Sequence, residues 1–402
     1  MRGQAIYAIV GVVILVLFLP GPDAHAQSRA TKAKQQRSVK QFSMVFNYGY
    51  AGDHFPTDAT QFERVVIGVK NANFNTILCK YEDWRAEICK KHSIRIMVDL
   101  LAGDHHVYKN IEGCKALCEK LRCNDTVLGY HLWSDRVGSR VVGRVRDSNN
   151  VHRWDPTHLT YVGTYKVDGN AFLTGVDVHG YYDEHAQRGG HFPHLMAAWS
   201  ASQKIDAPFF RYIFYGRQYG NRPNRVSYTV ATSIAFGLKG FLPHYLGGTI
   251  NMTTGELDVY GNIFRQINAA YTKVGPELIK IGIPEVVYSS PITMSWRKRD
   301  VPNSNPVPVS VGLQPIPKNF ELQVIQGDSV FGVFDYGKNR RAVWFANHNA
   351  YNPQKMKVAL IGAKKVSLFD RVNGGWKTLA VENGMIGFTI PGGLGELVLV
   401  ER

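Results

Sequence analysis

Between residues 42 and 245, apolar strand-like runs alternate with amphipathic helix-like segments, and this alternation constrains the fold more than any other feature. The runs are nearly continuous in apolar residues, which is typical of parallel strands that are covered on both faces. The segments between them carry apolar residues at helical spacing, as in 59–72, where Phe62, Val65 and Val69 share one face. The eight strand-like runs are 42–50, 75–81, 94–102, 126–135, 159–165, 175–183, 208–216 and 237–245.

Eight strand–helix units over about 240 residues match the size of a (β/α)8 barrel. An open doubly wound sheet is the competing arrangement, and it would carry a Gly-rich phosphate-binding turn after the first strand. The sequence at that position is NYGYAGDH, which lacks this fingerprint. We therefore predict an α/β fold with a TIM barrel over residues 41–282, closed by a helix over 261–280.

The C-terminal segment, residues 283–402, changes to an alternation of period 2, as in VFGVFDYG and KVALIG. This pattern is typical of antiparallel strands, and the Asn-Gly pairs at 373–374 and 383–384 fit tight hairpin turns. The segment predicts a smaller antiparallel β-sandwich domain, with the Pro-rich stretch 300–317 as a long loop. We expect Trp344 and Trp376 in its core.

The N-terminal 26 residues have the organisation of an export signal. Arg2 supplies a positive charge, 5–19 form an apolar stretch, and Ala24-His25-Ala26 is a small-x-small cleavage pattern. The apolar stretch is shorter than the about 20 residues that a membrane helix needs. We predict a secreted or periplasmic protein without stable membrane insertion after signal cleavage; the alternative is that the stretch stays uncleaved as an anchor. Residues 27–40 contain five Lys or Arg and no acid, which predicts a basic disordered tether.

The chain has a net charge of +15, which favours polyanionic partners. It has no basic helix and no RNA-binding signature, so nucleic acid is not an expected partner, whereas an acidic or sulfated polysaccharide is. Five cysteines lie between residues 79 and 123. Because five is odd, at least one thiol stays unpaired within the chain, and we expect structural roles for all of them.

Aromatic, acidic and amide side chains are dense at the carboxyl ends of the predicted strands, where the active sites of such barrels lie. Sugar rings present an apolar face and a hydroxyl edge, so a sugar site needs flat aromatic surfaces beside polar groups. The alternative interpretation is that these aromatic residues only close the core. The candidate substrate-binding residues are Asn47, Tyr48, Trp84, His131, Trp133, His179, Tyr181, Arg217, His244 and Tyr245.

Cleavage of a glycosidic bond generally needs two carboxyl groups on either side of the bond. Asp135 ends the fourth strand beside Trp133 and is the candidate general acid, because a buried setting would raise the pKa of its carboxyl group. Asp183 and Glu184 follow the sixth strand and are the candidate partners. The alternative is that Asp135 is a loop residue paired with a neighbouring arginine.

Three segments resemble secreted barrels related to the clan A and family 42 glycoside hydrolases. They are GYHLWSDR…WDPTHLTYVG (129–163), VDVHGYYDEH (176–185) and VSYTVATSIAFGLKGFLPHY (226–245), and their order and spacing carry the resemblance. The resemblance implies hydrolysis of the glycosidic bonds of a poly- or oligosaccharide, with a sandwich domain after the barrel.

Two departures from that family pattern matter. Ser134-Asp135-Arg136 stands where the family has Asp-Glu-Pro, so the acid is one carbon shorter than expected. The seventh strand and its exit, 208–220, contain no acid, and Arg217 lies near the position of the family nucleophile. Three explanations stay open: an unusual, inverting carboxylate pair, an anionic glycan whose charge Arg217 meets, or a catalytically inactive glycan-binding barrel.

A metal site would need further strands to converge on Asp104-His105-His106 or Asp177-Val178-His179. The segment His191-Phe192-Pro193-His194 is interrupted by proline and predicts a loop. We therefore expect neither a metal nor another cofactor.

Overall fold

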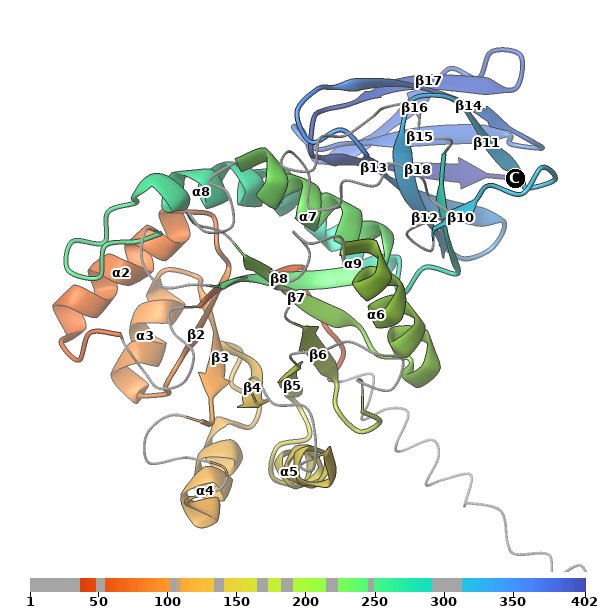
Figure 1. Ribbon diagram of the computed structural model, residues 1–402. Helices are drawn as coiled ribbons and strands as arrows, with labels where there is room; N and C mark the ends of the chain where they lie inside the picture. The colour runs from red at the N-terminus through yellow and green to blue at the C-terminus, as the bar shows by residue number, and fades with distance from the viewer. Residues whose placement is uncertain are drawn as a thin grey trace, which may run out of the picture.

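The computed structural model shows a closed barrel of eight parallel strands followed by a domain of two β-sheets (Figure 1). This confirms the predicted fold class. The structure describes residues 37–47, 55–101, 107, 109–133, 141–164, 173–181, 191–214, 223–244, 249–290 and 313–402.

The barrel strands run in sequence order, and β1 closes the ring by pairing with β8. Each structural strand lies inside the run predicted for it. The strands are β1 (Ser43–Asn47), β2 (Thr76–Cys79), β3 (Arg95–Asp99), β4 (Val127–Trp133), β5 (Leu159–Thr164), β6 (Val178–Tyr181), β7 (Phe209–Phe214) and β8 (Leu238–His244).

Helices surround the barrel and pack apolar residues on it, and α7, which lies between the barrel and the C-terminal domain, is buried almost throughout. In α2, Phe62, Val65 and Val69 are fully buried, and the side chain of Asp58 accepts a hydrogen bond from Gln61 N at 2.8 Å, which caps the first turn. The barrel helices are α2 (Ala59–Asn71), α3 (Asp83–Lys91), α4 (Ile111–Leu121), α5 (Val141–Trp154), α6 (His191–Ile205), α7 (Pro223–Ala235), α8 (Val259–Thr272) and α9 (Gly275–Lys280).

Two expectations about helices were wrong. The predicted helix 261–280 is divided into α8 and α9, because Pro276 lacks the amide hydrogen needed to continue a helix and instead starts a new one. The segment His191–His194 forms the first turn of α6 rather than a loop, since Pro193 stands in the first turn, where a missing amide hydrogen costs nothing.

The C-terminal domain has a seven-stranded sheet with the order β10-β9-β12-β13-β18-β15-β16 and a three-stranded sheet with the order β11-β14-β17. Only the pairing of β9 with the two-residue strand β10 is parallel among the pairings described there. The strands are β9 (Val286–Ser289), β10 (Gln314–Pro315), β11 (Leu322–Gln326), β12 (Ser329–Asp335), β13 (Arg340–Asn347), β14 (Gln354–Leu360), β15 (Lys365–Asp370), β16 (Gly375–Leu379), β17 (Met385–Ile390) and β18 (Gly395–Glu401).

One of the two Asn-Gly pairs forms the predicted two-residue hairpin turn, whereas Asn373-Gly374 lies in a longer loop between Asp370 and Gly375. Asn383 and Gly384 both have positive φ, and a two-residue turn joins Glu382 to Met385, as predicted for an Asn-Gly hairpin. Most of the Pro-rich stretch 300–317 lies outside the described residues; its end contributes β10.

The central strands of the seven-stranded sheet, β12, β13 and β18, are buried on both faces. Phe331 and Phe345 point into the sandwich core, where their ring centroids are 5.2 Å apart. The alternate residues of β12 and β13 pack on the barrel: Trp344 is fully buried, and its indole Nε1 donates to the carbonyl of Ala231 in α7 at 2.8 Å. The contact between the two domains is visible in Figure 1 beside α7. Trp344 is therefore buried, but in the contact with the barrel rather than in the sandwich core where it was expected.

Residues 37–40, which we assigned to the disordered tether, lie against the amino end of the barrel. Val39 is 9% exposed and packs into the apolar cluster inside the strands. The Arg37 side chain forms an ion pair with Asp177, with Nε and Oδ1 3.3 Å apart. The segment carries one apolar residue among its charges, and the burial of Val39 together with the Arg37–Asp177 ion pair holds it against the barrel.

Candidate functional site

Strand register determines which side chains face the inside of the barrel at its carboxyl end. Asp99 of β3 is the register partner of His131 of β4, and Phe214 of β7 is the partner of His244 of β8. Asn47, at the end of β1, follows the buried inward residue Val45 by two positions and therefore lies on the same face. The structure thus places three predicted site residues, Asn47, His131 and His244, at this end of the barrel interior.

Asp99 and His131 form a buried polar pair. Asp99 Oδ1 lies 3.1 Å from His131 Nδ1 and also accepts a hydrogen bond from Leu101 N at 3.0 Å. The residues are 9% and 3% exposed, respectively. Because a carboxylate only accepts, the proton of a neutral His131 ring lies on Nδ1 and leaves a lone pair on Nε2. Nε2 is buried and has no hydrogen-bond partner among the described residues.

Aromatic rings support His131 from inside the barrel. The ring of Tyr161, on β5, has its centroid 5.5 Å from that of His131, and Tyr161 in turn contacts Phe210 and Tyr212 of β7. Gly180 of β6 makes room for this arrangement, since a Cβ atom there would overlap the Tyr161 hydroxyl. The imidazole is therefore held from one side by a carboxylate and from another by packed rings.

His244 is a second buried imidazole at the same end. It is 4% exposed, and its ring makes edge contacts with Phe214 at 4.3 Å and Tyr212 at 5.4 Å between centroids. Burial lowers the pKa of His244 to about 3, so the ring is neutral at physiological pH. A neutral imidazole can donate one hydrogen bond and accept another, which suits contact with sugar hydroxyls.

His179 and Tyr181 lie in a different place from the expected one. Val178 and Gly180 are the inward residues of β6, so His179 and Tyr181 face the helices. His179 Nε2 accepts a hydrogen bond from Leu173 N at 2.8 Å, and burial lowers the pKa of this histidine to about 3.

The surroundings of Tyr181 confirm this orientation. Its ring lies 5.3 Å from the guanidinium carbon of Arg211, and that guanidinium donates to Ser233 of α7 at 2.7 Å. Trp84 also lies in the helical layer, where its ring packs on Phe62 of α2 at 5.3 Å. These contacts give His179, Tyr181 and Trp84 structural positions, and we leave them out of the candidate site.

The remaining predicted residues lie outside the described parts of the structure. They are Tyr48, Asp135, Asp183, Glu184, Arg217 and Tyr245, together with the side chain of Trp133, whose backbone ends β4. Asp99 and Tyr161, which hold the His131 ring in place, were not among the predicted site residues. The signal for both is positional: each is the register neighbour of His131 on an adjacent strand.

Within the described ranges, no group of three or more His, Cys, Asp or Glu side chains could hold a metal ion. Nor does any helix in those ranges have the length and apolar character needed to cross a membrane. The five cysteines are free thiols; Cys79, Cys89, Cys114 and Cys118 are buried and Cys123 is exposed.

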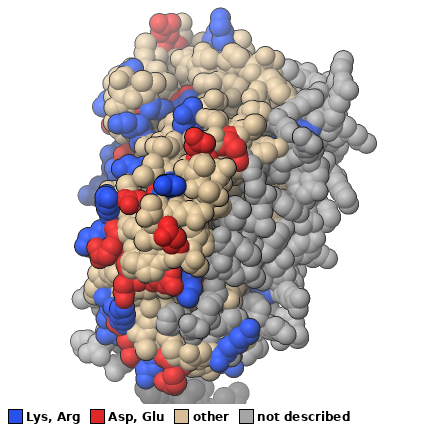
Figure 2. Space-filling view, turned by 90° about the vertical axis from the view of Figure 1, so that its left-hand side faces the viewer, with Lys and Arg blue, Asp and Glu red and all other residues tan. Residues whose placement is uncertain are grey.

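Charged side chains are mixed in sign over the described part of the face shown in Figure 2. This face belongs to the α2–α4 side, where Lys91 lies 2.7 Å from Glu63 and Lys120 lies 2.7 Å from Asp83. On this face, the net positive charge of the chain is not gathered into a patch that would attract a polyanion.

No protein-family profile matches the chain, and a search of curated proteins finds no similar sequence. Solved structures do match. One described as a glycoside hydrolase has a TM-score of 0.52 and 12% identity, with 90% of this chain and 92% of that one covered. A family 5 glycoside hydrolase from Bacteroides vulgatus has a TM-score of 0.51 and 10% identity, with coverage of 90% and 89%.

An α-amylase from Geobacillus thermoleovorans in complex with acarbose has a TM-score of 0.50 and 9% identity, with coverage of 91% and 99%. At such low sequence identities, the similarity shows a shared fold and nothing more specific. It extends over nearly the whole length of each protein, so the barrel and the sheets after it are shared together. The chain therefore has the architecture of glycoside hydrolase barrels, in agreement with the resemblance seen in its sequence.

Proposed function

We propose that this protein hydrolyses glycosidic bonds of a poly- or oligosaccharide at the carboxyl end of its barrel. The observation that carries the proposal is the Asp99–His131 pair, in which a buried imidazole is oriented by a carboxylate and keeps one nitrogen unpartnered among the described residues. A buried polar atom without a partner is costly, and a ligand hydroxyl would satisfy it. The fold, shared with glycoside hydrolases, supports the same interpretation.

The proposal assigns the proton transfer to Asp135, two residues after β4. Its carboxyl group would protonate the leaving oxygen, while Asp183 or Glu184 attacks the anomeric carbon or activates water. Asn47, His131 and His244 would bind sugar hydroxyls, and Trp133 would pack on a ring face. Arg217, near the end of the seventh strand, would meet the charge of an acidic or sulfated glycan.

The proposal includes export, because cleavage of the N-terminal signal would deliver the enzyme to polysaccharides outside the cytoplasm. Mass spectrometry of the exported protein should find its N-terminus at Gln27. Retention of residues 1–26 would contradict this part of the proposal.

The main test is an activity screen of the purified protein on neutral, uronic and sulfated glycans, with release of reducing ends as the readout. Asp135→Asn should lower kcat/KM by about 10²–10⁴, the range for loss of a general acid. Asp58→Asn is the matched control, because Asp58 is exposed and asparagine also caps a helix well.

Loss of cleavage in Asp135→Asn, with activity retained in Asp58→Asn, supports the proposal. Should the protein cleave no glycan, yet bind one with equal affinity in the wild-type and Asp135→Asn forms, the protein is a glycan-binding barrel. The absence of any acid in 208–220 is the sequence observation that favours this second function.

A further inference from the structure

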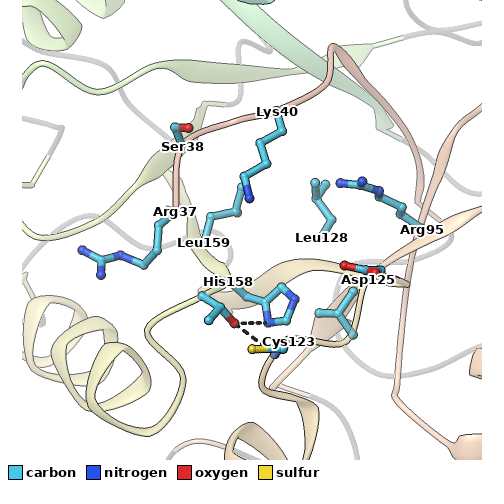
Figure 3. A pocket seen from close by; sticks show the side chains of 11 residues that line it. Arg37, Ser38, Lys40, Arg95, Cys123, Asp125, Leu128, His158 and Leu159 are labelled. Carbon is cyan, nitrogen blue, oxygen red and sulfur yellow. Dashed lines mark hydrogen bonds between the residues drawn. The ribbon is translucent and has the colours of Figure 1, made fainter. Parts of the chain in front are cut away.

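A separate cavity lies at the amino end of the barrel, opposite the candidate active site. It has a volume of about 270 Å³ and is enclosed by the segment before β1 and by the beginnings of β3, β4 and β5 (Figure 3). Its lining residues are Arg37, Ser38, Lys40, Arg95, Cys123, Asp125, Val127, Leu128, Thr157, His158 and Leu159. We call it the amino-end cavity.

Two of its three cations are available to a ligand. Arg37 is already engaged with Asp177, but the side chains of Lys40 and Arg95 have no ion-pair or hydrogen-bond partner among the described residues. Figure 3 shows the side chain of Lys40 reaching down from the segment before β1, and the guanidinium group of Arg95 reaching toward the same space from the side. Asp125 is the one acid in the described lining, and it forms no ion pair with either cation.

Two other polar residues of the lining, His158 and Thr157, already have hydrogen-bond partners. His158 Nδ1 lies 2.6 Å from Asp155, and Nε2 lies 3.0 Å from the carbonyl of Asn124. The Thr157 hydroxyl donates to Asp155 at 2.6 Å and accepts from Cys123 N at 3.2 Å. The charged groups left without a partner in the described lining are therefore Lys40, Arg95 and Asp125, so the two cations outnumber the one acid.

The base of the cavity is apolar. Leu128 and Leu159, at the starts of β4 and β5, are 5% and 2% exposed and belong to the apolar cluster inside the barrel. Apolar walls lower the local dielectric constant, which strengthens the attraction between a cation and an anionic group. The volume lies below the range of about 300–1,000 Å³ that is typical of pockets for drug-sized ligands, so the cavity suits one small group.

We propose that the amino-end cavity binds a small oxyanion through Lys40 and Arg95. The planar guanidinium group of Arg95 matches two oxygens of a sulfate, phosphate or carboxylate group, and Lys40 adds a point charge from the segment before β1. The anion is either a free ion or a group on a monosaccharide. The proposal is independent of the hydrolysis proposed above, since the two sites share no residue.

The test is calorimetric titration of the full chain at low ionic strength with sodium sulfate, sodium phosphate, glucuronate and uncharged glucose. Lys40→Gln should weaken binding of the anions about tenfold, as expected for loss of one charged contact. Lys40 is exposed, so this substitution should leave the fold intact. Lys364→Gln, at an exposed position of the C-terminal domain, is the matched control and should bind as the wild type does.

Arg95→Lys tests whether the guanidinium group itself binds the anion, because lysine keeps the positive charge but lacks the paired N–H donors. We expect this variant to bind the anions more weakly than the wild type does. Tighter binding of glucuronate than of the inorganic ions identifies a sugar-borne group, and equal or weaker binding identifies a free ion. Equal affinity for glucuronate and glucose, or unchanged anion binding in Lys40→Gln, overturns the proposal.

Discussion

Lys239 provides a direct test of the energetics of this fold. It lies on β8 with its side chain directed away from the barrel interior, toward α9 and the C-terminal domain. Its Nζ donates to the carbonyl of Leu278 at 2.6 Å and lies 5.6 Å from the centre of the Phe334 ring. The residue is 5% exposed, and burial lowers the pKa of its amine from 10.5 to about 7.

The sign of the resulting pH dependence follows from proton binding. Between pH 7 and 10.5 the unfolded chain keeps the proton of Lys239 and the folded protein does not, so the free energy of unfolding rises with pH. The rise is about 1.4 kcal/mol for each pH unit. Over the whole interval it amounts to about 5 kcal/mol, which is the cost of burying the charged amine at and below pH 7.

Lys239→Met removes the amine and keeps an apolar side chain of similar length. The variant loses the hydrogen bond to Leu278, at a cost of about 1 kcal/mol, so it should be about 4 kcal/mol more stable than the wild type at pH 6. This advantage should decrease by about 1.4 kcal/mol for each pH unit above 7.

The assay is guanidinium-induced unfolding, followed by tryptophan fluorescence at pH 6, 7, 8, 9 and 10 for both proteins. Other titrating groups are common to both and cancel in the difference. Lys364→Met, at an exposed position, should show no pH-dependent difference from the wild type. A difference between Lys239→Met and the wild type that stays constant from pH 6 to 10 would refute the reasoning.

Two further substitutions test local packing and capping. Gly180→Ala should destabilise the barrel by about 1–3 kcal/mol, since the new methyl group overlaps the Tyr161 hydroxyl. Adding Tyr161→Phe removes that hydroxyl and should recover part of the lost stability. If chemical denaturation shows no recovery in the double variant, the contact does not account for the loss. Asp58→Ala should lower the free energy of unfolding by about 1 kcal/mol, whereas Asp58→Asn, which keeps a capping side chain, should change it little. Thermal unfolding measures both variants, and an equal loss of stability in the two would show that the cap does not stabilise α2.

The barrel could be predicted from sequence because parallel strands buried on both faces give nearly continuous apolar runs. Each run contained its strand, and the run 75–81 is longer at its carboxyl end than the strand Thr76–Cys79 inside it. The same physics misled the interpretation of the C-terminal domain in one respect. The central strands of its large sheet are covered on both faces, so β13 is buried almost throughout rather than at alternate residues.

Proline was the second source of error, because its effect depends on position within a helix. Pro193 was taken to exclude a helix, yet it stands in the first turn of α6, where no amide donor is required. The sequence predicts one helix around Pro276, but the structure has two helices, and Pro276 lies in the first turn of the second, α9. The sequence shows where a proline stands in the chain, but not whether that position lies in the first turn of a helix or in its interior.

The candidate site shows why the inward-facing residues of a buried strand are hard to identify from sequence. When both faces of a strand are apolar, no alternation tells which residues point inward, so His131 and His179 look equivalent in sequence. The register separates them: His131 pairs with Asp99 inside the barrel, whereas His179 accepts a backbone hydrogen bond among the helices. Both histidines are deeply buried, so burial alone would not distinguish them either. Only His131 combines an inward position, a carboxylate that fixes its tautomer and a nitrogen without a partner among the described residues. That combination, rather than the residue type, is what makes it a candidate for contact with substrate.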